Sequence, residues 1–152
     1  MSLLSYGEAS IEDLPRIVEM KLAMFEEAGF SHLLASDAAS VVLSDYRQLY
    51  QERRALHMVA RSKAEIVACV GAFVKSDLPF RYFDPPQYGF LGDVYTDSHY
   101  RGRGIATKLS GDAIGWLKDC NVRMVRLLAS ESASSIYAKL GFKPTDEMML
   151  EL

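Results

Sequence analysis

The chain has 152 residues, of which 49% are hydrophobic and 24% charged, and it carries a net charge of −3 at pH 7. This length is typical of one domain that buries roughly two thirds of its unfolded surface, so we expect a single domain over residues 1–152. The slightly acidic balance excludes a general nucleic-acid binder, which needs a basic face, and no apolar run is long enough to predict a membrane span.

The first third of the chain predicts a strand and two helices. Residues 3–8 carry a weak strand signal. Over residues 11–28 apolar side chains recur at helical spacing, and Gly29 is expected to end this helix. A second amphipathic helix is expected to begin after Ser36 and Asp37 and to end near residue 54.

The hydrophobic period then changes from helical to alternating. Residues 57–61 and 66–74 are short runs of β-prone residues, and the four residues between them predict an antiparallel hairpin. Residues 75–89 follow, with prolines set among aromatic residues. This segment is either a loop that faces the substrate or a packed surface excursion, and its position alone favours neither.

An apolar run over residues 90–95 and a turn cluster over residues 97–100 lead into a helical pattern. Such a strand, tight loop and helix N-terminus can hold a phosphate group, because the first N–H groups of a helix lack intrahelical partners and the helix dipole is positive there. Glycines let the loop backbone approach a ligand, and arginines add positive charge. The glycine and arginine positions are Arg101, Gly102, Arg103 and Gly104.

The segment after this loop predicts a helix over residues 105–120, because its apolar residues follow one helical face. Gly111 and Gly115 lie four residues apart on this helix. Their lack of a side chain predicts a close approach between the helix and a sheet.

The C-terminal part predicts two strands around a short helix. Residues 122–129 favour a buried strand, residues 130–140 favour a short helix that ends at Gly141, and residues 147–151 favour a final strand. The centre of the chain is therefore expected to run strand, phosphate loop, helix, strand, helix, which indicates an α/β fold.

The two cysteines, Cys69 and Cys120, lie in apolar surroundings without a paired spacing. Neither a disulfide framework nor a metal site is predicted, and both residues are expected to be buried free thiols. The N-terminus lacks a charged segment followed by an apolar run, so the expected location is cytoplasmic.

Three kinds of phosphate loop compete for the segment after residue 96. A P-loop needs Gly-x-x-x-x-Gly-Lys followed by Ser or Thr, which the sequence lacks. A dinucleotide-binding loop needs a third glycine where Thr107 stands. The pattern that fits is Arg101-x-x-Gly104-x-Ala106. It resembles the acyl-CoA signature of the GNAT superfamily of N-acetyltransferases, Gln or Arg-x-x-Gly-x-Gly or Ala.

A second motif strengthens this resemblance. It is the run Ser130-x-x-Ala133-x-x-Ile136-Tyr137-x-Lys139-Leu140-Gly141-Phe142, which is similar to the family's Asn-x-x-Ala-x-x-Leu-Tyr-x-Lys-x-Gly-Phe element. The two motifs stand in the family's order and separation. The resemblance implies an α/β (α+β) fold with a mixed, mostly antiparallel central sheet flanked by helices. In this fold the central strands that match residues 90–96 and 122–129 splay apart and admit the thioester.

The resemblance also implies the acyl donor and the residues that contact it. The donor is acetyl-CoA, which acts as a cosubstrate without a metal ion. Its pantetheine arm would follow the backbone of residues 94–96, and its pyrophosphate would lie on residues 102–107. Ser130 stands where the family often has asparagine, and serine has a shorter reach. The implied cofactor-binding residues are Val94, Tyr95, Thr96, Arg101, Gly102, Arg103, Gly104, Ile105, Ala106, Thr107, Ser130 and Tyr137.

Tyr137 matches the tyrosine that faces the CoA sulfur in the family. A phenol of pKa about 10 is a weaker acid than a thiol of pKa about 8.5, so complete proton donation is uphill by roughly 2 kcal/mol. We therefore expect Tyr137 to stabilise the leaving thiolate by a hydrogen bond at least as much as by donating a proton. The alternative is that Tyr137 only packs the last helix.

The base that removes a proton from the amine is harder to identify. Some family members carry a glutamate on the strand after the cofactor helix, but residues 124–129 contain no acid. Asp93 is the best placed carboxylate for a catalytic role, and Glu131 is second. Each also has a structural alternative, Asp93 as a partner of the backbone and Glu131 as a helix N-terminal residue. His99, near the phosphate loop, is expected to be solvated.

The resemblance implies direct transfer of an acetyl group to a primary amine of a small molecule or peptide, with neither nucleic acid nor membrane as a partner. Two alternatives remain: a non-catalytic acyl-CoA sensor or partner module, and a transferase for a longer acyl group. An acidic, aromatic acceptor pocket near Glu26, Glu27, Asp37 and residues 80–88 is one interpretation, and helix exteriors with packed loops are another. Dimerisation is common in the family, but no residue specifically supports a homodimer here.

Overall fold

The computed structural model describes residues 3–77 and 85–152. Its strands are β1 (Leu4–Glu8), β2 (Ala55–Ser62), β3 (Glu65–Ser76), β4 (Gln87–Thr96) and β5 (Val125–Leu127). Its α-helices are α1 (Leu14–Glu27), α2 (Ala38–Gln51), α3 (Ile105–Asp119) and α4 (Ser134–Lys139), and its 3-10 turns are η1 (Ile11–Asp13), η2 (Ser31–Leu33) and η3 (Ser98–Tyr100). Within the described ranges, no helix combines the length and the apolar character that crossing a membrane requires.

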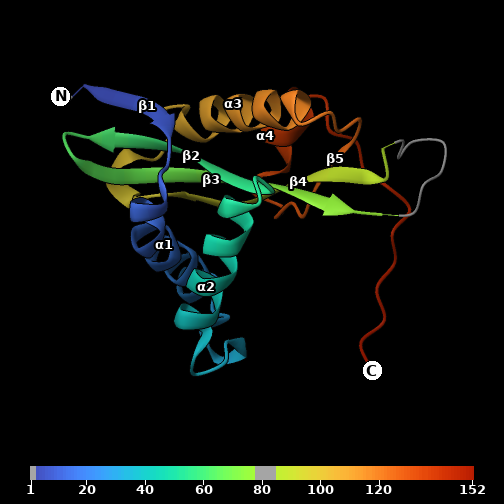
Figure 1. The fold of residues 1–152 in the computed structure, drawn as a ribbon, viewed down its shortest axis with the longest axis horizontal. Coiled ribbons are helices and arrows are strands. Elements are labelled where there is room, and N and C mark those ends of the chain that lie inside the picture. The colour runs from blue at the N-terminus through green and yellow to red at the C-terminus, as the bar shows by residue number, and fades with distance from the viewer. Residues whose placement is uncertain (1–2, 78–84) are drawn as a thin grey trace.

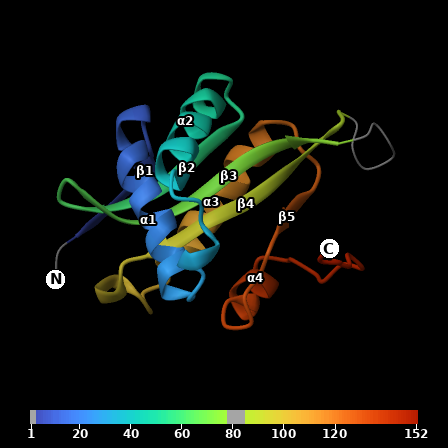
Figure 2. The same ribbon diagram turned by 90° about the horizontal axis from the view of Figure 1, so that it is seen from below.

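The strands form one five-stranded sheet in the order β1-β2-β3-β4-β5. The first four strands pair antiparallel, and β5 joins β4 in parallel after the chain has passed through α3. Figure 1 shows the sheet between two helical layers, with α1 and α2 on one face and α3 on the other. Figure 2 shows that α4 lies beyond β5. The expected mixed, mostly antiparallel sheet flanked by helices is confirmed.

Each face of the sheet carries its own hydrophobic core, because side chains alternate along the strands. In β2, Met58 and Ala60 belong to the core that α3 covers, whereas Val59 belongs to the core under α1 and α2. The apolar face of α3 is almost fully buried, and it comprises Ile105, Leu109, Ala113 and Leu117. These two cores fix β4, whose C-terminal end leads into the loop before α3.

The first three elements confirm the sequence predictions, with shifts of a few residues. β1 lies within residues 3–8, and the first helix begins with the turn η1 before α1. Both expected hairpin strands are present and are longer than predicted. β3 and β4 also extend into residues 75–89, so the chain between them is residues 77–86, of which 78–84 lie outside the described residues. The two interpretations of that segment therefore stay open.

The predicted close approach at Gly111 and Gly115 is wrong. Both glycines lie on the exposed face of α3, and a Cβ atom added to either would meet nothing within 4 Å. The close contact is made by the strand instead, because a Cβ at Gly89 of β4 would lie 2.9 Å from Leu117 Cδ1. Glycine spacing on a helix does not reveal which face is buried, whereas the apolar positions do.

Two strand predictions near the C-terminus are also wrong in extent or existence. The strand expected over residues 122–129 is limited to β5, and it is half-buried rather than buried. It carries Arg126 and pairs with β4 only over Gly89–Leu91. Residues 147–151 form no strand, because they pair with no described strand edge, and Met148 and Met149 are 94% and 95% exposed.

The centre of β4 contains a β-bulge at Asp93. Between the cross-strand pairs Cys69–Tyr95 and Gly71–Gly92, β4 has one residue more than β3. Asp93 takes up the extra length with φ +52°, in the left-handed region that aspartate tolerates better than most residues. Past Leu91, β4 no longer pairs with β5, so the two strands part at the bulge.

Candidate active site

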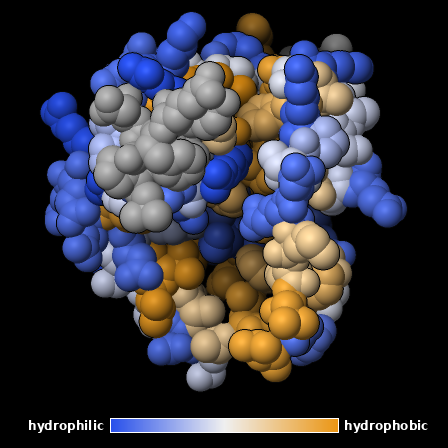
Figure 3. Space-filling model, turned by 90° about the vertical axis from the view of Figure 1, so that its right-hand side faces the viewer, coloured by the Kyte–Doolittle hydropathy of each residue, from blue (hydrophilic) through white to orange (hydrophobic). Residues whose placement is uncertain are grey.

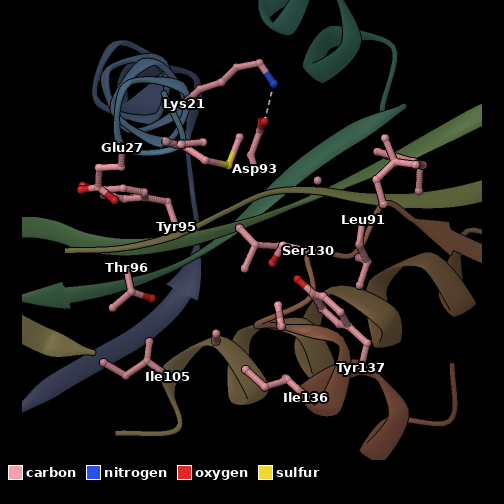
Figure 4. Close-up of a pocket in the computed structure, with 18 of the residues that line it drawn as sticks. Lys21, Glu27, Leu91, Asp93, Tyr95, Thr96, Ile105, Ser130, Ile136 and Tyr137 are labelled. Atoms are coloured by element: carbon pink, nitrogen blue, oxygen red, sulfur yellow. Dashed lines mark hydrogen bonds and ion pairs between the residues drawn. The ribbon is translucent and has the colours of Figure 1, made fainter. Parts of the chain in front are cut away.

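A pocket of about 1040 Å³ opens where β4 and β5 part. Its lining comes from α1, α2, β3, β4, the loop before α3, the start of α3 and residues 128–137. Figure 3 shows one side of the molecule, where hydrophobic side chains border a hollow in the surface. In Figure 4, Ile105, Ile136 and Tyr137 lie on one side of β4, and Lys21 and Glu27 lie on the other. We call these two sides the cofactor half and the acceptor half of the pocket.

The pocket brings together most of the residues that the sequence singled out. Two motifs that are about thirty residues apart in the chain meet here. The predicted site residues in the lining are Asp93, Val94, Tyr95, Thr96, Arg101, Gly102, Gly104, Ile105, Ala106, Thr107, Ser130 and Tyr137. Arg103 is outside the lining. Its guanidinium lies 5.2 Å from the centre of the Tyr100 ring and donates to the His99 carbonyl.

The loop before α3 has the geometry of an anion site made of backbone. Gly102 and Gly104 adopt φ +75° and +74°, a region open to glycine, and Cβ atoms there would project into open space. The hydrogen bond from Lys108 N–H to the Gly104 carbonyl, 3.1 Å long, opens α3. The N–H groups of residues 105–107 therefore have no intrahelical acceptor and remain to bind a ligand.

Arg101 is held by partners on β4 and α1. Its Nε donates to the Thr96 carbonyl at 2.8 Å, and its NH2 group lies 2.7 Å from Glu27 Oε2. Tyr95 donates to the other oxygen of Glu27 at 2.9 Å. The hydrogen bond from Arg101 lowers the pKa of Glu27 below its ordinary value. This cluster connects the end of α1 to the phosphate loop across the pocket.

Tyr137 lies on α4, in the cofactor half of the pocket. The residue is 7% exposed, and its ring packs edge-on against Phe142 at 6.0 Å. Figure 4 shows its hydroxyl directed toward the side of the pocket where Ser130 lies. Burial raises the pKa of Tyr137 above that of a free phenol, which keeps the hydroxyl protonated at neutral pH.

Asp93 is 4% exposed, and both of its carboxylate oxygens accept hydrogen bonds. Tyr46 Oη lies 2.5 Å from Oδ2, His57 Nε2 lies 2.8 Å from the same oxygen, and Lys21 Nζ lies 2.5 Å from Oδ1. The bulge in β4 is what allows Asp93 to make these contacts. Strict alternation would put Asp93 on the face of Leu91, which belongs to the core under α3. The extra residue turns Asp93 toward α1 and α2 instead.

His57 continues this polar network into the core under α2. It is fully buried, and its Nδ1 lies 2.7 Å from the Tyr50 hydroxyl, which also accepts the His57 backbone N–H at 2.9 Å. All these contacts are satisfied when Nε2 carries the proton toward Asp93 and Tyr50 donates to Nδ1. Three groups from three separate elements therefore hold one carboxylate in place, and Tyr50 in turn holds His57.

The contacts in this network shift the pKa values of its members in opposite directions. Burial raises the pKa of Asp93, but the hydrogen bond from His57 and the charge and hydrogen bond of Lys21 together outweigh burial and hold it far below its ordinary value. Burial and the Asp93 charge both raise the pKa of Tyr46 and of Cys69. The Cys69 thiol donates to the Asp93 carbonyl at 3.2 Å. Asp93 is therefore a stable anion, and Cys69 is a protonated thiol at neutral pH.

The remaining sequence candidates lie at the rim or outside the pocket. Ser130 lines it, and its hydroxyl lies 3.2 Å from that of Ser132. Glu131 and His99 are exposed, and neither is in the lining. The described residues contain no group of three or more histidine, cysteine, aspartate or glutamate side chains that could hold a metal ion.

The sequence reasoning missed Lys21, Tyr46 and His57. Each stands in an element that was predicted correctly, and each was treated as part of a helix face or strand. A histidine among the apolar residues at the start of β2 was the one available signal, because a buried histidine needs polar partners.

Comparisons with known proteins agree with this arrangement. The sequence model of the acetyltransferase (GNAT) family matches residues 21–142. Aminoglycoside N(6')-acetyltransferase type 1 from Acinetobacter haemolyticus is 25% identical, over 98% of this chain and 95% of that protein.

Solved structures of acetyltransferases share the fold. A structure from Clostridium acetobutylicum, described as an acetyltransferase with acetyl-CoA, has a TM-score of 0.89 at 23% identity and covers 99% of this chain and 96% of that one. An aminoglycoside 6'-N-acetyltransferase from Acinetobacter haemolyticus has a TM-score of 0.70 at 22% identity and covers 97% of each chain. Since the family match spans most of the sequence, this chain belongs to the acetyltransferase (GNAT) family and is an acyltransferase.

Proposed function

We propose that this acyltransferase moves an acetyl group from acetyl-CoA directly to a primary amine of a small molecule. The observation that carries the proposal is the pocket at the parting of β4 and β5, which is lined by both motifs and by the end of β4 that β5 leaves without a partner on that side. Acetyl-CoA is the donor that enzymes of this family use. Attack by the amine on the thioester in this gap would form the new C–N bond and release the CoA thiolate.

In this proposal the cofactor half binds the donor largely through its backbone. The pantetheine arm lies along Val94, Tyr95 and Thr96, where β4 no longer pairs with β5. The pyrophosphate lies on residues 102–107, where the N–H groups of residues 105–107 have no intrahelical acceptor and the open space at Gly102 and Gly104 admits a ligand. A backbone N–H of β4 at the bulge stabilises the oxyanion of the tetrahedral intermediate.

Tyr137 is proposed to support the leaving thiolate. An ordinary phenol is already a weaker acid than a thiol by roughly 2 kcal/mol, and burial raises the pKa of Tyr137 further. Full proton transfer from Tyr137 is thus costly, whereas a hydrogen bond to the developing sulfur charge is not. The Tyr137 hydroxyl acts as a preorganised hydrogen-bond donor, whose position is set before the reaction begins.

Asp93 is proposed to position β4 rather than to accept the proton of the amine. Transfer from an ammonium of pKa about 10.4 to a carboxylate of pKa at most about 3.9 costs roughly 9 kcal/mol, against roughly 5 kcal/mol for release to water at pH 7. Both Asp93 oxygens are already engaged by Tyr46, His57 and Lys21. The hydrogen bonds and the ion pair of Asp93 offset the strain of its left-handed backbone conformation. They also hold the bulge in β4 that directs the backbone toward the thioester.

An Asp93 series separates positioning from base catalysis. Asparagine keeps one acceptor oxygen and tolerates the left-handed conformation, whereas alanine does neither. If Asp93 positions β4, Asp93→Asn should keep most of kcat and the wild-type pH profile, whereas kcat of Asp93→Ala should fall by roughly 100-fold. If Asp93 were the base, both variants would lose kcat equally, and the lower limb of the pH profile would change.

The transfer is proposed to need no acetyl-enzyme. Cys69 is the thiol nearest to the bulge, but it is 1% exposed and its thiol donates a hydrogen bond to the Asp93 carbonyl. Its raised pKa keeps it as a thiol, which is a poor nucleophile.

The test is the release of free CoA thiol from acetyl-CoA across a panel of primary amines. The proposal predicts release that depends on the amine, with matching formation of the N-acetyl product. A protein that binds acetyl-CoA but gives no release with any amine would support the alternative of an acyl-CoA sensor. Faster release from propionyl- or succinyl-CoA would instead identify a longer acyl group as the natural donor.

A further inference from the structure

The acceptor half of the pocket has a floor of aromatic side chains. Tyr46 and Phe73 lie with ring centres 5.6 Å apart, and an ideal Cβ at Gly92 would lie 3.3 Å from Phe90 Cε1 and 3.6 Å from Phe73 Cε2. The absence of a side chain at Gly92 therefore keeps this floor open next to Asp93. Met24, Phe25 and Leu49 extend the apolar lining. Such a surface suits a molecule with an apolar body rather than a polyol.

Two lysines stand at different positions on this floor. Lys21 Nζ lies 5.8 Å from the Tyr46 ring centre, and its charge is already matched by Asp93. Lys75 Nζ lies 4.5 Å from the Phe90 ring centre and makes no ion pair with a described carboxylate. Lys75 is thus the lining ammonium whose charge remains for a ligand.

The acidic side chains of this half are few. Glu27 is paired with Arg101, and Asp93 is paired with Lys21. Asp45 of α2 lines the pocket and makes no ion pair within the described residues. Glu26 and Asp37, which the sequence suggested for an acidic acceptor pocket, are not in the described lining. Among the described residues that line this half, the charges without an ion-pair partner are therefore one anion, on Asp45, and one cation, on Lys75.

We propose, on the basis of the function proposed above, that the acceptor is an amine with an apolar body and one carboxylate, such as an apolar amino acid or short peptide. The carboxylate pairs with Lys75, the apolar body lies on the aromatic floor, and Asp45 attracts the ammonium group before it loses its proton. Opposite unpaired charges in one pocket complement a zwitterion. A polycation such as an aminoglycoside would find a single free carboxylate and would meet Lys75 as a like charge.

The experiment compares acceptors that differ only in the carboxylate. Phenylalanine and leucyl-phenylalanine are assayed by thiol release as free acids and as C-terminal amides, with phenethylamine and kanamycin alongside. A charged hydrogen bond of typical strength predicts that kcat/KM for each acid exceeds that for its amide by about tenfold or more. An amide as good as its acid, or kanamycin as the best acceptor, would overturn the inference.

Charge variants assign the preference to single residues. Lys75→Gln should bring the ratio of acid to amide close to one, whereas Asp45→Asn should raise KM for acids and amides alike. Lys118→Gln is the matched control, because Lys118 is an exposed lysine of α3 that is not in the lining. An unchanged ratio in Lys75→Gln would contradict the role of Lys75.

The outcomes also separate this inference from the function on which it rests. Acetylation of amines without any preference for the carboxylate would overturn the acceptor class and leave the acetyltransferase intact. If none of the amines released thiol from acetyl-CoA, both proposals would fail together.

Discussion

The two halves of the pocket are built from different parts of the chain. In the function proposed above, the cofactor half binds its ligand mostly through backbone, contributed by the end of β4 beyond its pairing with β5, the glycine loop and the first turn of α3. The acceptor half is mostly side chains, which come from α1, α2, β3 and β4, with His57 of β2 buried behind Asp93. A backbone site is specified by a short continuous sequence, whereas a side-chain site exists only after distant elements have packed. The two halves should therefore fail in different ways when single residues are changed.

The largest effect is expected in the acceptor half, where Asp93 connects several elements. Replacing Asp93 by alanine leaves His57 and Lys21 without their anion and removes a buried ion pair, which costs about 3–5 kcal/mol of unfolding free energy. Urea denaturation measures this loss directly. A loss below about 1 kcal/mol would show that the network does not hold the fold together.

The pH dependence of that contribution has a definite sign. The pKa of Asp93 is lower in the folded chain than its ordinary value near 3.9, so folding favours the ionised form. The stabilisation is complete above the ordinary pKa and is lost as pH falls through the lower folded value. We expect the stability difference between wild type and Asp93→Asn to be constant from about pH 5 to 8 and to shrink below about pH 4. A difference that grew in acid would contradict this.

The cofactor half should lose binding rather than stability. Gly104→Trp forces a left-handed conformation on a bulky residue and fills the space proposed for the pyrophosphate. We expect the affinity for CoA, measured by calorimetry, to fall by roughly 100-fold, which corresponds to about 2.7 kcal/mol. Unchanged CoA binding in this variant would remove the cofactor assignment of the loop.

Tyr137→Phe tests the role of one hydroxyl in the cofactor half. It removes one hydroxyl and keeps the ring that packs against Phe142. We expect kcat to fall about tenfold and the affinity for acetyl-CoA to change little, because the hydroxyl is proposed to act in the transition state. An unchanged kcat would leave Tyr137 with a packing role alone.

The smallest effect is expected on the exposed face of α3. Gly111 has no steric reason to be glycine, so Gly111→Ala should stabilise the fold by about 0.5–1 kcal/mol and leave CoA binding unchanged. Thermal denaturation checks the first part and calorimetry the second. Gly111→Ala also serves as the control for Gly104→Trp. A loss of stability in Gly111→Ala would instead support the close approach between α3 and the sheet that the sequence predicted at Gly111.

The same contrast explains what the sequence could predict. The motif around Gly104 and the motif that ends at Phe142 are local, and the elements that carry them were placed to within a few residues. The mixed sheet followed from the resemblance. The extent of β5 did not, because it depends on how far β4 stays beside it.

Few of the contacts that form the acceptor half could be predicted from the sequence. Asp93 was identified, but alternation places its side chain on the wrong face of β4, and only the bulge corrects this. Lys21 and His57 are 72 and 36 residues from Asp93 in the chain, so no local pattern relates them. The isolated histidine in β2 is a sign of a buried polar network, but it does not identify the partner.

A single transfer of acetyl from the thioester to the amine in this pocket can be followed by mass spectrometry of quenched reactions with carbon-13-labelled acetyl-CoA and an acceptor amine. We expect label on the amine in equal amount to the CoA released, and none on the protein at any time. An acetylated protein that forms and decays at the rate of turnover, or CoA release that is independent of the amine, would contradict it.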